Sequence, residues 1–314
     1  MSRRTAGVLL VAVSAASFGA LAIFARLAYA GGADVTAVLF LRFSVAAVLM
    51  AVILRLRRRR WPRGRLLLAL LALGGVGYVG QSLTFFTALT LVPASLVALL
   101  LYAFPPLVMV LSVVWLGERM TTVKAVALVL ALAGTVLTIG PELGGERLGI
   151  VLGLAAALIY AVYIVVGSRV TPRAGPLSAS AAIMLGAAAV YGVLVVVQRP
   201  AFPSTVGGWS AVAGLAVIST VVAITTFFAG MERLGAADTS TLSTLEPAVT
   251  AALAAAVLGE RVTPIQLAGG ALILAAVVLL ARAGAPTGQR VAAAAPPPTR
   301  SAAQPPTRSA AQPP

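Results

Sequence analysis

The chain contains no cysteine and no histidine, and acidic residues are scarce. Of its 314 residues, 23 are Lys or Arg and only 8 are Asp or Glu. Without cysteine, disulfides, thiolate nucleophiles and soft metal sites are excluded. Without histidine, the usual zinc ligand and the usual proton carrier at neutral pH are missing. We therefore expect no metal, no cofactor and no catalytic residue.

Apolar residues dominate the rest of the chain. They make up 60% of it, and the mean hydropathy is +1.03. A soluble protein of this size could not bury so much hydrophobic surface in its core. The net charge of +15 does not indicate nucleic-acid binding, because the basic residues lie in short loops and a tail without interleaved aromatics. The expected partners are a lipid bilayer and a small-molecule metabolite, with no nucleic acid; a homodimer is left open.

Apolar runs of about 20 residues, the length that crosses ~30 Å of hydrocarbon, recur along the chain. Helices are expected, because lipid offers no partner for an open backbone and alternating strand patterns are absent. Ten spans are predicted, at residues 6–27, 35–54, 66–89, 94–115, 122–140, 149–169, 177–197, 209–231, 237–257 and 264–281.

The basic residues predict the orientation of these spans. Lys and Arg collect on the cytoplasmic side, because their translocation is unfavourable. With a cytoplasmic amino terminus, only Arg26, Arg147, Arg199 and Arg261 fall on the outer side, and Arg42 falls within a span. We expect a multi-pass protein of the plasma or inner cell membrane with both termini in the cytoplasm.

A four-residue motif occurs twice at a fixed distance. Leu116–Arg119 recurs as Leu258–Arg261, and the same offset of 142 residues carries Pro105 onto Pro247. The chain is therefore one unit written twice. The motif itself is interpreted as a helix end with glycine as the terminating residue, and no chemistry is assigned to it.

Each copy is predicted to hold five spans. Because five is odd, the second copy must cross the bilayer in the opposite sense, an arrangement typical of transporters. The predicted fold is all-α transmembrane, with ten helices in two inverted five-helix repeats. The expected parts are a first repeat over residues 1–140, a linker over 141–148, a second repeat over 149–282 and a disordered cytoplasmic tail over 283–314.

The first span has an alternative interpretation as a signal peptide. Arginines near the start, an apolar run and an Ala-Tyr-Ala site at residues 28–30 resemble one. The run is longer than a usual signal core, Arg26 precedes the site, and the segment is the repeat partner of the helix around Tyr160. We therefore interpret it as a span.

Two ionisable residues lie deep within predicted spans, where each costs about 2.5 to 3.5 kcal/mol on insertion scales. Arg42 is in the second span and Glu246 is near the middle of the ninth. One interpretation is that they form a structural ion pair or face a water-filled cavity without a functional role. The other makes Glu246 a titrating or substrate-ammonium-binding carboxylate, with Arg42 as its counter-charge or as the anchor for a substrate carboxylate.

Prolines interrupt the spans at matching places in the two copies. Pro105, Pro106 and Pro247 each remove a helical hydrogen bond, and the last frees the Ser243 carbonyl. Broken helices in two inverted halves indicate a binding site at mid-membrane, and a packing kink is the alternative. The other polar or aromatic residues expected to line that substrate site are Gln81, Tyr102, Tyr160, Tyr163, Ser240 and Ser243.

This pattern resembles the ten-helix EamA family of the drug/metabolite transporter (DMT) superfamily. The residues that carry the resemblance are Leu41–Phe43, Phe85–Leu89, Pro105–Glu118, Gly235–Pro247 and Gly259–Glu260. The chain departs from the family at Phe18, where many members carry tryptophan, and at Arg26, where lysine is more usual. The resemblance implies a central cavity walled by spans one to four and six to nine, and export or exchange of small metabolites or toxic compounds.

We therefore predict a secondary transporter, not an enzyme, that exports or exchanges an amino-acid-like or amphiphilic metabolite by alternating access, with protons carried by Glu246 as the candidate driving force. A non-transporting membrane sensor or scaffold is the main alternative. An intramembrane protease is disfavoured, because histidine is absent and Asp34 and Asp238 lie near helix ends.

Overall fold

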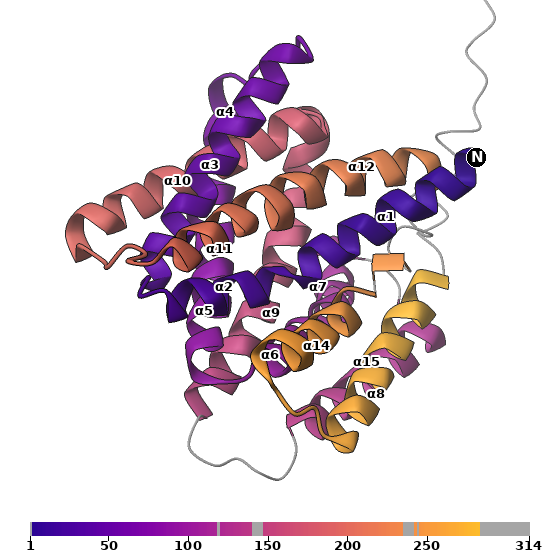
Figure 1. Cartoon of the computed structure of the whole chain (residues 1–314). Helices are drawn as coiled ribbons and strands as arrows, with labels where there is room; N and C mark the ends of the chain where they lie inside the picture. The colour runs from indigo at the N-terminus through magenta and orange to yellow at the C-terminus, as the bar shows by residue number, and fades with distance from the viewer. Residues whose placement is uncertain (1, 118–119, 140–146, 235–241, 244, 283–314) are drawn as a thin grey trace, which may run out of the picture. The chain divides into compact units, whose positions relative to one another are not determined.

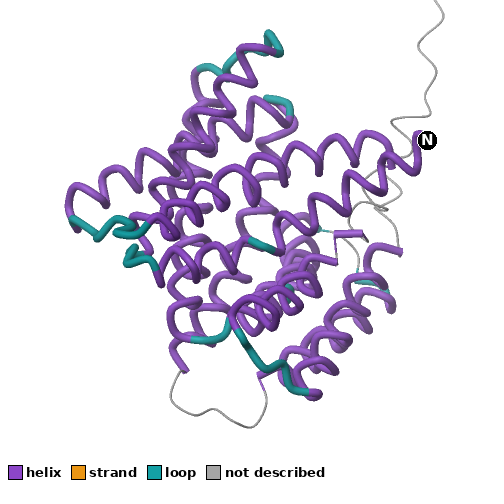
Figure 2. Tube along the Cα trace, viewed as in Figure 1, coloured by secondary structure: helices purple, strands orange, loops and turns teal. Residues whose placement is uncertain are grey.

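The computed structural model describes residues 2–117, 120–139, 147–234, 242–243 and 245–282 (Figure 1). Within this part of the chain every regular element is helical and no strand occurs (Figure 2). The motif residues 118–119, the predicted tail, most of the predicted linker and Ser240 lie outside the described residues.

The helices of the first copy follow the predicted spans with three interruptions. They are α1 (Arg3–Gly19), α2 (Leu21–Ala30), α3 (Val35–Leu56), α4 (Gly64–Ala72), the π-helical turn η1 (Leu73–Tyr78), α5 (Val79–Leu91), α6 (Ala94–Leu101), α7 (Phe104–Leu116) and α8 (Thr122–Ile139).

The second copy repeats this order. Its elements are α9 (Arg147–Val170), the 3-10 turn η2 (Thr171–Arg173), α10 (Pro176–Gln198), α11 (Val206–Ala216), the π-helical turn η3 (Val217–Val222), α12 (Ala223–Leu234), α14 (Leu245–Leu258) and α15 (Pro264–Arg282). The helix α9 begins at Arg147, two residues before the predicted start of the second copy.

Seven of the described apolar helical segments are long enough to cross a membrane, and three more are shorter. The seven begin at Thr5, Val35, Gly64, Ala94, Arg147, Leu177 and Val206, and the shorter ones cover Ala125–Leu137, Leu245–Leu258 and Pro264–Ala276. The protein is thus an all-helical, multi-pass membrane protein.

Helix ends follow from local sequence. The Ser2 side chain caps α1 by accepting from the Thr5 amide. At the carboxyl-terminal ends of α7 and α14, Gly117 and Gly259 have φ of +69° and +67°. Glycine adopts this left-handed conformation without strain. The two copies of the repeated motif therefore stop their helices in the same way, as the sequence predicts.

The helices pair in a pattern that the repeat explains. α8 packs along α15 and α3 along α10, so in each case an element meets its own repeat partner (Figure 1). α1 packs against α12. The repeat partner of α1 is α9 and that of α12 is α5, and these two partners also pack against each other. The main buried cluster lies where α2, α3, α5, α6 and α10 meet, and includes Phe43, Phe86 and Tyr191.

Close approach between α10 and the η1 region depends on two glycines. A Cβ at Gly74 would clash with the Ile183 carbonyl, and a Cβ at Gly186 would clash with the Leu71 carbonyl. Both clashes are with backbone, which cannot move aside. The glycines are therefore required for these helices to touch, as expected of small residues at membrane-helix contacts.

Candidate functional site

Glu246 lies at the start of α14, beside the break between α6 and α7. The chain leaves α6 and enters α7 on either side of residues 102–103. The Tyr102 hydroxyl donates to Oε2 of Glu246 at 2.9 Å and to the Ser243 carbonyl at 3.0 Å. The break therefore directs a phenol of the first copy onto a carboxylate of the second.

The prolines account for this geometry. Pro247 has no N–H, so it cannot donate to the Ser243 carbonyl four residues earlier, and the Tyr102 hydroxyl bonds to that carbonyl instead. Pro105 and Pro106 occupy the first turn of α7, where proline is tolerated but cannot continue the preceding helix α6.

One hydroxyl proton faces two acceptors at this contact. A charged Glu246 accepts a hydrogen bond from the Tyr102 hydroxyl. A protonated Glu246 can donate its own proton to the Tyr102 oxygen, and the tyrosine proton then goes to the Ser243 carbonyl. The arrangement thus offers Glu246 a hydrogen bond in either protonation state.

The backbone of Glu246 rests directly against α1. The Thr250 hydroxyl, one turn further along α14, donates to the Gly19 carbonyl at 2.9 Å. A Cβ placed on Gly19 would lie 2.9 Å from the Glu246 carbonyl oxygen and 2.9 Å from Val249. Glycine at the end of α1 is therefore what lets α14 approach this closely.

Arg42 is the other deep ionisable residue, and it is 3% exposed in α3. Its Nε donates to the Thr220 hydroxyl at 3.0 Å, in the π-helical turn η3. Its guanidinium carbon lies 5.1 Å from the Phe43 ring centroid and 5.3 Å from that of Phe86. Aromatic faces and a hydroxyl thus stabilise the charge, and its two terminal nitrogens have no hydrogen-bond acceptor among the described residues.

A continuous run of aromatic rings connects the neighbourhoods of Glu246 and Arg42. Successive ring centroids are 5.9, 4.8, 5.9, 5.4, 5.1 and 5.5 Å apart. In order, the rings are Tyr102, Phe104, Tyr160, Tyr163, Tyr78, Phe43 and Tyr191. The run draws on both copies, and Tyr191 ends it with a 2.8 Å hydrogen bond to the Ser82 hydroxyl.

Arg42 and Glu246 do not form an ion pair within the described part of the chain. Arg42 bonds to Thr220 and lies over Phe43 and Phe86, whereas Glu246 bonds to Tyr102. The structural ion pair is therefore not observed directly, and each charge lies beside different rings of the aromatic run.

Gln81 is less well accounted for than the other predicted residues. It is buried in α5, and its side-chain amide makes no hydrogen bond to the described residues. Its neighbour Ser82 makes the contact with Tyr191 instead. The structure thus brings Tyr102, Ser243 and Glu246 together and connects them through Phe104 to Tyr160 and Tyr163, but it shows no hydrogen bond from Gln81 to any of them.

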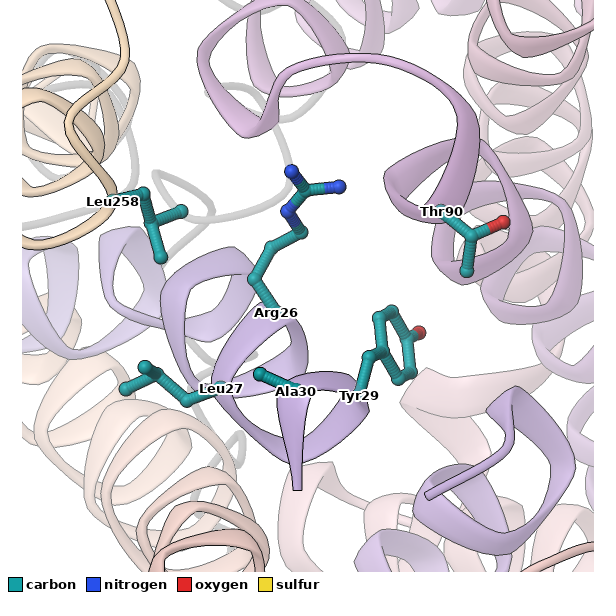
Figure 3. A pocket seen from close by; sticks show the side chains of 6 residues that line it. All are labelled: Arg26, Leu27, Tyr29, Ala30, Thr90 and Leu258. Carbon is teal, nitrogen blue, oxygen red and sulfur yellow. The ribbon is translucent and has the colours of Figure 1, made fainter. Parts of the chain in front are cut away.

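A hollow of about 360 Å³ lies away from these residues, and none of the predicted site residues lines it (Figure 3). Its walls are Arg26, Leu27, Tyr29 and Ala30 of α2, Thr90 of α5 and Leu258 at the end of α14. Nη1 of Arg26 donates to the Leu89 carbonyl at 2.7 Å. Pro93 cannot bond that carbonyl, so Arg26 completes the end of α5.

Glu260, two residues after α14, is bound to the start of α6. Its Oε1 accepts from the Ala94 amide at 2.8 Å, and its Oε2 accepts from the Ser95 amide at 3.1 Å and the Ser95 hydroxyl at 2.8 Å. The positive φ of Gly259 turns the chain so that the carboxylate points this way. A carboxylate is favourable at a helix amino terminus, where backbone N–H groups lack partners.

Sequence reasoning missed this role of Glu260, although the repeated motif was a signal for it. It also missed Phe104, Tyr78, Phe43 and Tyr191 in the aromatic run. From the sequence alone, an aromatic residue in a membrane helix is interpreted as facing lipid or as packing against a neighbouring helix. Only the tertiary contacts show that these rings form one continuous wall.

Comparison with known proteins decides the family. The EamA-like transporter family matches the chain twice, over residues 5–140 and again over residues 147–282. The chain belongs to the EamA-like transporter family. Its relatives are transporters of the DMT superfamily, and the predicted resemblance is confirmed.

Two curated relatives cover most of the chain. An uncharacterized transporter of Archaeoglobus fulgidus is 30% identical over 272 residues, which are 86% of this chain and 94% of the relative. The threonine/homoserine exporter RhtA of Escherichia coli K12 is 28% identical over 278 residues, which are 86% of this chain and 88% of the relative.

A third relative and a solved structure extend the comparison. The aromatic amino acid exporter YddG of Ancylobacter novellus is 28% identical over 163 residues, which are 50% of this chain and 56% of that protein. A solved crystal structure superposes with a TM-score of 0.63 at 23% identity, covering 89% of this chain and 98% of the other. That likeness concerns the fold alone.

Proposed function

We propose that this member of the EamA-like family is a secondary transporter that exports or exchanges a small amphiphilic metabolite of amino-acid character by alternating access. One observation carries the proposal. A partly buried carboxylate, at Glu246, and a buried guanidinium, at Arg42, lie near different parts of one run of aromatic rings and do not form an ion pair.

Each part of this arrangement matches one part of an amino acid. A guanidinium with two unused nitrogens suits a substrate carboxylate, which accepts two parallel hydrogen bonds. The Glu246 carboxylate suits an ammonium group. The rings of Phe104 and Tyr160, 4.8 Å apart, suit an apolar side chain or, face-on, the cation. Relatives named as exporters of threonine, homoserine or aromatic amino acids agree with this class.

We propose ten spans in two inverted repeats, with both termini in the cytoplasm. Contacts near the span ends support this topology. The Ser178 hydroxyl donates to the Arg60 carbonyl at 3.0 Å, joining the predicted cytoplasmic end of the seventh span to a predicted cytoplasmic loop. The Ala201 amide donates to Asp34 at 2.7 Å, joining two segments predicted to be outside. The reciprocal pairing of α1 with α12 and α9 with α5 is the pattern that inverted repeats produce.

Proton coupling would act through Glu246 and Tyr102. Proton uptake by Glu246 removes the charge that holds the substrate ammonium, and the Tyr102 hydroxyl adjusts by turning its proton to the Ser243 carbonyl. The Glu246 carboxylate then binds either a proton or the solute ammonium, but not both at once. Such competition couples the export of one to the import of the other when the carrier does not switch with its site empty.

Counterflow in proteoliposomes tests the proposal. Vesicles containing the purified protein are loaded with one member of a panel of amino acids, amines, sugars and nucleosides, and entry of the labelled compound is followed. We expect accumulation for zwitterionic amphiphiles and none for sugars. If no compound moves in either direction, the transporter is excluded and a sensor or scaffold becomes the better interpretation.

A further inference from the structure

The helix α6 is held at both ends by the segment that contains α14. At its carboxyl end, the Tyr102 hydroxyl is bonded to Glu246, which begins α14. At its amino end, the Ala94 and Ser95 amides are bonded to Glu260, which follows α14. The two helices are thus antiparallel, and each of the two contacts joins the first copy to the second.

We propose that Glu260 is a latch. Its bonds to the amino terminus of α6 hold closed the face of the protein at which α5 and α14 end, and they break each time the site at Glu246 opens to that face. This inference rests on the proposed alternating access, which requires the two copies to separate at one face and then at the other.

The neighbouring contacts show why the latch sits at this point. The turn between α5 and α6 is held from within its own copy by Arg26, through the Leu89 carbonyl. Among the described side-chain hydrogen bonds, those of Glu260 are the only ones that join this turn and the start of α6 to the second copy. Loss of the Glu260 contact therefore removes the hydrogen bonds between this turn and the second copy. The packing of Leu91 and Val92 against Gly149 of α9 and the attachment to the first copy remain.

The hollow beside this turn indicates a closed conformation. Leu258 and Thr90 line it, so it lies where α14 and α5 end, but Glu246 and Tyr102 do not reach it. Ala94 and Ser95 are buried at 0% and 4% exposure directly behind the Glu260 carboxylate. In the proposed mechanism a path from this face to Glu246 opens when α6 moves away from α14.

The absence of native cysteine allows a direct labelling test. Ser95→Cys gives a single thiol behind the carboxylate, and its reaction with a charged maleimide in proteoliposomes reports exposure. Adding Glu260→Gln should raise the labelling rate roughly tenfold, a change of about 1.4 kcal/mol. Asp34→Asn is the matched control, because Asp34 binds the Ala201 loop amide and not α6. An unchanged rate in the Glu260 variant overturns the latch.

Cross-linking distinguishes a latch from a static helix cap. Ser95→Cys combined with Glu260→Cys is bridged by a short bifunctional methanethiosulfonate, whose two disulfide links are reducible. We expect counterflow to stop on bridging and to return on reduction, while reagent on either single-cysteine variant leaves it running. Transport that continues through the bridged protein shows that the contact never opens, and the proposal fails.

The two experiments separate this inference from the proposed function. If the cysteine-free parent moves no solute, alternating access is wrong, and cross-linking has no readout. The maleimide rate at Ser95→Cys still decides whether Glu260 controls exposure of α6. If the parent transports and the bridged protein does too, only the latch is lost.

Discussion

The Thr250 hydroxyl donates to the Gly19 carbonyl at 2.9 Å and so joins α14 to the end of α1. The donor lies one turn after Glu246, whose own backbone oxygen would be 2.9 Å from a Cβ at position 19. Glu246 is therefore positioned by backbone contact with α1 as well as by its side chain. Any added volume at Gly19 displaces the carboxylate.

Gly19→Ala should destabilise the protein and impair transport together. The new methyl group meets a carbonyl oxygen and Val249, and overpacking of this kind costs about 1 to 3 kcal/mol. Thermal unfolding in detergent measures the first effect and counterflow the second. Gly80→Ala is the matched control, since a Cβ there meets Ile159 at an ordinary 3.6 Å. Equal behaviour of the two variants would show that the contact with α1 is not tight.

Glu246→Gln should remove the pH dependence of transport. The amide cannot take up or release a proton, so uptake driven by a pH gradient should fall at least about tenfold, while solute-for-solute exchange persists at a reduced rate. Initial rates measured from pH 5 to 9 in the two assay modes separate these effects. A variant with the pH profile of the parent would exclude proton coupling through Glu246 without excluding transport.

Arg42→Gln should weaken binding of solutes that have a carboxylate. A hydrogen bond to a charged group contributes about 1.5 to 3 kcal/mol, so affinity for the zwitterion should fall roughly 10- to 100-fold. The affinity for the corresponding carboxamide should not change. Arg26→Gln serves as the control, because Arg26 bonds to the Leu89 carbonyl instead. A parallel loss for acid and amide would assign Arg42 to packing.

Tyr102→Phe should lower stability, because the hydrogen bond donated by this hydroxyl to Glu246 or to the Ser243 carbonyl is lost. Such a hydrogen bond contributes about 0.5 to 1.5 kcal/mol, and its loss is measured as a lower unfolding temperature. Tyr163→Phe is the comparison variant, since the Tyr163 hydroxyl makes no hydrogen bond within the described residues and its ring contacts are retained. If both substitutions are equally mild, the contact from Tyr102 to Glu246 contributes little.

Much of the architecture could be predicted from the sequence, because in lipid the length and apolarity of a segment decide whether it is a helix. Seven predicted spans correspond to described helices long enough to cross a membrane, and the other three contain shorter apolar helices. The helix ends at Gly117 and Gly259 follow from the turn that glycine permits. The interruption at residues 102–103 was also signalled, by Pro105 and Pro106. The π-helical turns were not predicted. The glycines of Leu73–Tyr78 weaken α-helical propensity there, but Val217–Val222 has no glycine, so propensity does not identify the two turns.

The sequence by itself determined that this is a helical membrane protein built from a duplicated unit, with one deep acid and one deep base. Those properties depend on composition and on the repeat, which are readable without coordinates. Only the tertiary structure decided that Arg42 meets Thr220 and not Glu246, that seven rings join into one wall, and that Glu260 binds α6. The physical reason is that a hydrogen bond is made within about 3 Å, and side chains from helices far apart in sequence reach that distance only through helix packing.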